Sequence, residues 1–205
     1  MPASAFRRIA AFGIDWLLIL GWAGCVAAVG IPLYLSGTTA ALSVTAVGII
    51  ATTVLVVPVT IWLAWLESGR SQATIGKRAL RLKVTRRTTE GPLTFGRALV
   101  RNALKIALPW TLGHAAALQI AGTGTPGTTS WTTWLLTAAA YLLPLWYVVS
   151  LFVGAGLTAY DRTAETQVVP RELASPGAVA VAGRVTRPAA QAGGLRGRRR
   201  SAGSR

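Results

Sequence analysis

Fifty-one consecutive residues, Trp16–Leu66, contain no charged side chain, and their sequence is WLLILGWAGCVAAVGIPLYLSGTTAALSVTAVGIIATTVLVVPVTIWLAWL. A helix rises about 1.5 Å per residue, so about 20 apolar residues cross a hydrocarbon core of about 30 Å. This stretch is therefore long enough for two membrane-spanning helices and a connecting turn. Pro32, Gly37 and the hydroxyl-bearing residues beside Gly37 favour a turn near its middle.

A second uncharged stretch covers 55 residues, 106–160, and has turn-forming residues between Gly122 and Ser130. The two stretches together predict an all-α membrane protein, a four-helix transmembrane bundle occupying 1–169. We expect the spans near residues 10–31, 41–66, 103–121 and 131–157.

The composition excludes most soluble enzymes. Hydrophobic residues make up 52% of the chain and charged residues only 13%, about half the usual share for a soluble domain. One Cys and one His argue against a disulfide framework and against zinc sites built on Cys or His clusters. We therefore predict no catalytic residues, no metal site and no cofactor, and we expect the chain not to be an enzyme.

The basic residues predict the orientation. Of 21 Lys and Arg, two precede the first span, ten lie within 67–105 and nine follow Asp161, while the two short turns carry none. Basic loops stay on the cytoplasmic side of a membrane. We expect a multi-pass protein of the inner (plasma) membrane, with the central loop and both termini cytoplasmic.

The central loop alternates apolar and polar residues over 79–86, which predicts a strand. Thr88–Gly91 supplies a turn, and Pro92–Leu93 would begin the return strand of a short β-hairpin. An amphipathic surface helix over 75–83 is the alternative. Thr94 is a suitable N-cap for a helix that starts at Phe95.

The C-terminal segment 170–205 is rich in Ala, Gly, Pro and Arg, and it predicts a disordered basic cytoplasmic tail. Such a tail is attracted to anionic lipid headgroups. Nucleic-acid binding is not favoured, because no aromatic residues are interleaved with the basic ones.

Several polar motifs follow one another along the chain: Arg8 to Asp15, then Thr74-Ile75-Gly76-Lys77-Arg78, then Arg101-Asn102, and finally Thr158-Ala159-Tyr160-Asp161-Arg162. Over about residues 6–170 this set resembles the RDD family of bacterial polytopic membrane proteins. The resemblance implies that Arg8, Asp15 and Asp161 are the Arg and two Asp of the family name. Many relatives have His where this chain has Tyr160. Cation–proton exchange, proposed for some members, is a further implication.

Asp15 lies about 10 Å into the first span by the helical rise, so we expect it to need a partner. Arg8 and Arg101 are the leading candidates, with Lys105 a third, and Asp161 lies at the same membrane side. An ion-paired clasp, an ion or proton site, and simple hydration are the alternatives. His114, about 13 Å deeper than Lys105, is either a proton relay or a hydrogen-bonding partner of a neighbouring helix.

These features predict a structural or partner-binding membrane component. The alternative is a small cation/proton-coupled transporter that works as a homo-oligomer, because four spans are few for a complete transporter. An enzyme acting on lipid is a third and weaker reading.

Overall fold

The computed structural model describes residues 3–88, 91–122, 130–153 and 156–171. In chain order its elements are α1 (Ala5–Leu35), α2 (Val44–Ser68), α3 (Ile75–Ala79), β1 (Leu82–Arg86), α4 (Phe95–Asn102), the π-helical segment η1 (Ala103–Ala107), α5 (Leu108–Gly122), α6 (Trp131–Ser150), α7 (Ala159–Thr163) and β2 (Thr166–Pro170). The tail expected over 170–205 lies outside the described residues from Glu172 onward.

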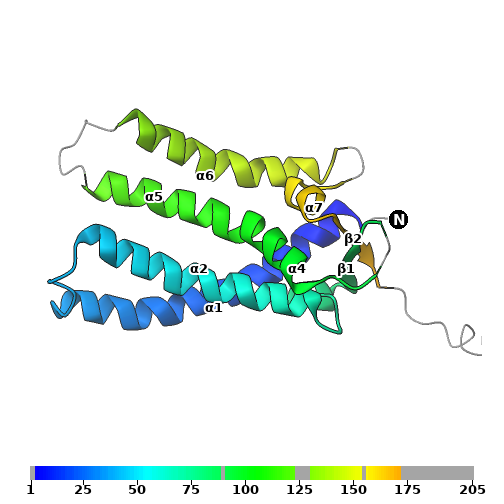
Figure 1. Ribbon diagram of the computed structural model, residues 1–205, viewed down its shortest axis with the longest axis horizontal. Helices are drawn as coiled ribbons and strands as arrows, with labels where there is room; N and C mark the ends of the chain where they lie inside the picture. The colour runs from blue at the N-terminus through cyan, green and yellow to red at the C-terminus, as the bar shows by residue number, and fades with distance from the viewer. Residues whose placement is uncertain (1–2, 89–90, 123–129, 154–155, 172–205) are drawn as a thin grey trace, which may run out of the picture. The chain divides into compact units, whose positions relative to one another are not determined.

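Three described helices, α1, α2 and α6, are long and apolar enough to cross a membrane. Large apolar side chains on their surfaces are exposed, among them Leu17, Val57 and Leu142. In Figure 1, α1 lies beside α2, and α5 lies beside α6. The strands and α7 gather at the end of the helices where the N-terminus lies, and α3 contacts α1 and β1.

The expected third span is a broken helix. The chain from Phe95 to Gly122 is helical throughout, but it passes through η1 before α5 begins at Leu108, and α5 has only 15 residues. The Leu108 N–H bonds the Ala103 carbonyl, one residue further back than in an α-helix. The wide turn precedes Pro109, which has no N–H for the Lys105 carbonyl. The last expected span, 131–157, is also shorter than predicted, because α6 ends at Ser150.

The predicted hairpin is wrong in its second strand. β1 does form, but it pairs antiparallel with β2, with Leu82 opposite Pro170, Val84 opposite Val168 and Arg86 opposite Thr166. The segment at Gly91–Leu93 only contacts the end of β1: Gly91 accepts from the Arg86 N–H and the Pro92 carbonyl accepts from Arg86 Nε. Pro92 has no N–H for a ladder, whereas β2 contains β-branched Thr and Val residues. The strand predicted over 79–86 and the alternative helix over 75–83 are each correct in part, because α3 ends at Ala79 and β1 begins at Leu82.

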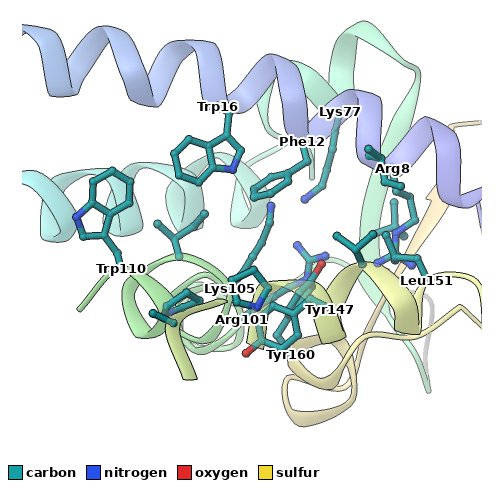
Figure 2. A pocket seen from close by; sticks show the side chains of 17 residues that line it. Arg8, Phe12, Trp16, Lys77, Arg101, Lys105, Trp110, Tyr147, Leu151 and Tyr160 are labelled. Atoms are coloured by element: carbon teal, nitrogen blue, oxygen red, sulfur yellow. The ribbon is translucent and has the colours of Figure 1, made fainter. Parts of the chain in front are cut away.

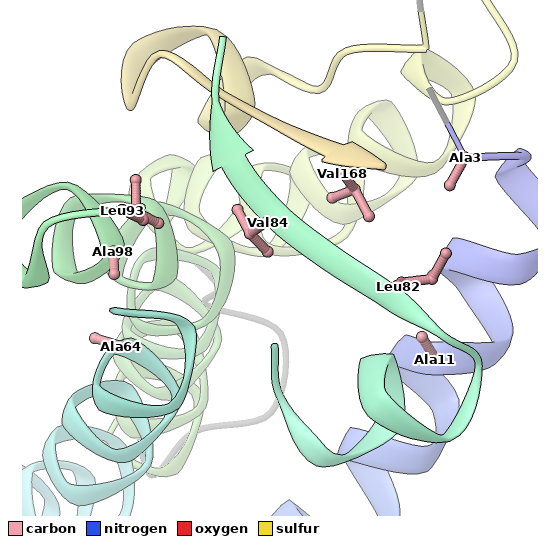
Figure 3. Close-up of a cluster of buried hydrophobic side chains, with 8 residues drawn as sticks. All are labelled: Ala3, Ala11, Ala64, Leu82, Val84, Leu93, Ala98 and Val168. Atoms are coloured by element: carbon pink, nitrogen blue, oxygen red, sulfur yellow. The ribbon is translucent and has the colours of Figure 1, made fainter. Parts of the chain in front are cut away.

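A small apolar core lies beneath the two strands. Leu82, Val84 and Val168 point from the strands toward Ala11 of α1 and Ala98 of α4, and all five side chains are buried (Figure 3). Leu93 is also buried there, which explains its apolar character without a strand. The strand pair is thus packed on the ends of the long helices, and it fixes the loops that carry the charged residues described next.

Candidate functional site

Asp15 is held by backbone and hydroxyl donors rather than by a cation. Its carboxylate, 1% exposed, accepts hydrogen bonds from the Thr74 hydroxyl at 2.6 Å and from the Gly76 N–H at 2.8 Å. Thr74 is also the N-cap of α3. The expected ion pair of Asp15 with Arg8, Arg101 or Lys105 does not form, because the start of α3 reaches the carboxylate and the Gly76 N–H and Thr74 hydroxyl compensate its charge.

Gly76 permits this close approach. A Cβ atom built on Gly76 would lie 2.0 Å from the Ala11 carbonyl oxygen and 3.0 Å from Oδ1 of Asp15. Only a residue without a side chain lets α3 lie against α1 at this distance. Gly76 therefore positions both its own N–H and the Thr74 hydroxyl on Asp15.

Arg101 of α4 joins two carboxylates from different parts of the chain. Its Nη1 donates to both oxygens of Glu67, at 2.7 and 2.9 Å, while its Nε and Nη2 donate to Oδ1 of Asp161 at 3.0 and 2.8 Å. All three side chains are at most 1% exposed. The planar guanidinium provides forked donors for two acids, a geometry that a lysine cannot reproduce.

Each acid has further donors. Glu67, near the C-terminal end of α2, also pairs with Lys77 of α3 and accepts from Asn102 Nδ2 at 2.9 Å. Asp161 also pairs with Arg8 of α1, and it forms a capping box with Thr158 at the start of α7. We call Arg8, Asp161, Arg101, Glu67 and Lys77 the charge network. It connects α1, α2, α3, α4 and α7.

The network sets the pKa values of its members outside the long helices. Burial alone would raise the pKa of Asp161, but the Arg101 and Arg8 guanidinium groups hold it below its ordinary value of 3.8. Burial opposes the charge of Arg101 too, yet the carboxylates of Glu67 and Asp161 hold its pKa above the ordinary value. Asp161 and Arg101 are therefore both charged at neutral pH.

The remaining sequence-predicted residues lie beside the network rather than in it. The Lys105 Nζ atom lies 4.2 Å from the ring centroid of Phe12, a cation–π contact. The His114 ring stacks on Trp110, which in turn stacks on Trp16. His114 is thus part of an aromatic stack, and a proton relay through it stays a prediction.

Sequence reasoning did not include Glu67 among the site residues, and it quoted Lys77 only as part of a motif and not as a charge partner. The chain has only six acidic residues, and three of them, Asp15, Glu67 and Asp161, are at most 1% exposed. Glu67 directly follows the first uncharged stretch and lies at the same end of the helices as Asp161, because Arg101 pairs with both. An acid at that depth in such a basic chain was a usable signal for an ion pair.

The pairing of Asp15 can be tested by double-mutant cycles. We expect Asp15 and Thr74 to be coupled by about 1 kcal/mol or more, since a buried hydrogen bond to a charged group is lost. Asp15 and Arg101, which share no partner, should couple by less than about 0.5 kcal/mol. The measurement is thermal unfolding in detergent of Asp15→Asn, Thr74→Val, Arg101→Met and the two doubles. A stronger Asp15–Arg101 than Asp15–Thr74 coupling would contradict the assignment.

Helices of membrane-spanning length, tied together at one end by a buried charge network, define a mostly helical membrane-type protein. The chain belongs to the RDD family, a membrane-associated family, whose match covers residues 2–121. Arg8, Asp15, Glu67, Lys77 and Arg101 lie within the matched residues, whereas Asp161, assigned from the resemblance, lies beyond them. No curated protein and no solved structure matches the chain.

Proposed function

We propose that this chain is a multi-pass membrane protein with a structural or partner-binding role and no enzymatic activity. The observation that carries the proposal is the state of its buried acids. Asp15, Glu67 and Asp161 all have oxygens occupied by donors fixed on other elements. Such acids stabilise a rigid arrangement, whereas a transported cation needs carboxylate oxygens that can exchange their partners.

The proposed placement has four spans in the cytoplasmic (plasma) membrane, with both termini inside. The five residues of η1 and fifteen of α5 together supply 20 residues, close to the 30 Å of a hydrocarbon core. Such a broken helix is tolerated in a membrane where it is covered by neighbours, and α5 packs on both α6 and α2. The basic residues of the central loop and tail favour the cytoplasmic side.

The proposal also includes contacts with the lipid bilayer and its anionic headgroups, and assembly with other membrane components or with a second copy. The exposed apolar surfaces of α1, α2 and α6 are available for either. Small-residue pairs such as Gly24 and Ala28 on α1 could support helix–helix contacts.

The experiment is reconstitution of the purified protein in liposomes loaded with a pH-sensitive dye. Under imposed Na⁺, K⁺ or Li⁺ gradients we expect no proton movement above that of protein-free liposomes. Proton movement that is abolished by Asp15→Asn would contradict the proposal and support the cation/proton-coupled transporter. Reporter fusions at Gly37 and Gly127 should be found outside, and those at Glu90 and Arg205 inside, which checks placement independently of transport.

A further inference from the structure

A cavity of about 370 Å³ lies next to the charge network, between α1 on one side and α5 and α6 on the other. Four cationic side chains line it: Arg8, Lys77, Arg101 and Lys105. Figure 2 shows Lys105 and Lys77 directed into the same space, next to Phe12 of α1. The rest of the wall is mostly apolar or aromatic and includes Trp16, Trp110, Pro144 and Val148.

The cavity exposes the cations and not their acids. Among the described residues that line it there is no Asp or Glu, because Glu67 and Asp161 contact the cations from outside the cavity. Glu67 and Asp161 compensate part of this charge, but the four cations outnumber them and leave a net positive potential in this poorly solvated space. The cavity therefore complements an anion rather than a cation.

Among the described residues, no acid forms a direct ion pair with Lys105. Its residue is only 9% exposed, and within the described part of the chain its ammonium makes no hydrogen bond or ion pair, only the contact with the Phe12 ring. A buried ammonium normally needs a charged or hydrogen-bonding partner. An anion bound in the cavity would supply that partner.

The shape of the cavity favours an amphiphile over a free anion. The apolar wall extends along α6 from the cationic end, and Val148 on α6 and Ile9 on α1 are 42% and 37% exposed. The cavity thus opens on an apolar surface that the proposed membrane placement puts in contact with lipid chains. A headgroup at Lys105 and a hydrocarbon chain along Val148 would use both parts of the wall.

We propose that this cavity is a binding site for an anionic membrane phospholipid, whose phosphate is held by Lys105, Lys77 and Arg8 and whose acyl chain lies against Phe12, Trp16 and Val148. The inference rests on the proposed membrane placement but not on the absence of transport. It differs from a diffuse attraction of the basic tail to headgroups, because it requires named residues on α1, α3 and η1.

The test uses the full-length protein in a non-ionic detergent, with bound lipid counted by native mass spectrometry during titration. Phosphatidylglycerol should bind with saturation at one molecule per chain, and phosphatidylcholine with the same acyl chains should bind at least tenfold more weakly. Glycerol phosphate, the soluble headgroup, should not compete at equal concentration. Equal binding of the two lipids, or full competition by glycerol phosphate, would overturn the proposal.

Two variants probe the two ends of the site. Lys105→Gln removes a cation that has no acid partner, so the charge network stays paired, and phosphatidylglycerol binding should weaken about tenfold. Val148→Trp should also weaken phosphatidylglycerol binding, because the larger side chain narrows the apolar part of the cavity. The matched control is Arg70→Gln, which removes an exposed positive charge outside the cavity and should leave binding unchanged.

These outcomes distinguish a failure of the proposed lipid site from a failure of the membrane placement or of the structural role. Thermal unfolding without added lipid shows whether each variant is folded, and a folded Lys105→Gln protein that binds phosphatidylglycerol like wild type overturns the site. Reporter fusions found on the opposite side of the membrane from the one expected would instead refute the membrane placement. Proton movement in the liposome assay would refute the structural role while leaving the lipid site intact.

Discussion

Gly76→Ala should cause one of the largest losses of stability that a single added methyl group can cause in this protein. The new Cβ would lie 2.0 Å from the Ala11 carbonyl oxygen, which is backbone within α1 and cannot rotate away as a side chain can. Overpacking typically costs about 1–3 kcal/mol. Here α3 must also move away from α1, which lengthens the Gly76 and Thr74 hydrogen bonds to Asp15, so we expect more than about 3 kcal/mol.

The measurement is the midpoint of thermal unfolding in detergent, together with the yield of monodisperse protein. Gly13→Ala is the matched control, because Gly13 lies on α1 two residues from Ala11 and a Cβ there meets nothing within 4 Å. That control should be neutral or slightly stabilising, since Ala favours a helix over Gly. If Gly76→Ala unfolds at the same temperature as Gly13→Ala, the close packing of α3 on α1 is wrong.

The elements that depend on local pattern were predictable from the sequence. Long uncharged stretches indicated α1 and α2, alternation indicated β1, and the helix after Thr94 begins at Phe95 as expected. The partner of β1 was not predictable in this way, because β2 begins 80 residues after β1 ends. A local hairpin has the smaller loop-closure cost, yet Thr166–Pro170 provides the better strand.

The candidate site shows the same division. The sequence placed Arg8, Asp15, Arg101 and Asp161 on one membrane side, and in the structure Asp161 pairs with both Arg8 and Arg101. Which residue pairs with which acid was not predictable. The charge of an acid and its position along a helix do not show whether its partner is a cation or the N-terminus of another helix. Asp15 bonds Thr74 and Gly76, whose role depends on a backbone approach that sequence spacing does not reveal.

Arg101→Met should be strongly destabilising, because it removes the centre of the charge network. Asp161 would retain Arg8, and Glu67 would retain Lys77, but both acids would lose forked donors while staying buried. Breaking a buried ion pair by removing one partner costs about 3–5 kcal/mol. Arg101→Lys should recover only part of this, since one ammonium cannot bind both carboxylates in the forked geometry.

Arg97→Met is the matched control on the same helix, one turn earlier. Arg97 pairs with Glu165 at 2.7 Å, but their side chains are 40% and 56% exposed, so its loss should cost at most about 1 kcal/mol. Adding Glu67→Gln and Asp161→Asn to Arg101→Met should lower the stability further, because the buried Arg8 and Lys77 then lose their remaining ion-pair partners. Equal melting temperatures for Arg97→Met and Arg101→Met would show that the network does not hold α2, α4 and α7 together. A triple variant more stable than Arg101→Met alone would contradict the expected further loss, and would show that Arg8 and Lys77 do not compensate the two acids once Arg101 is gone.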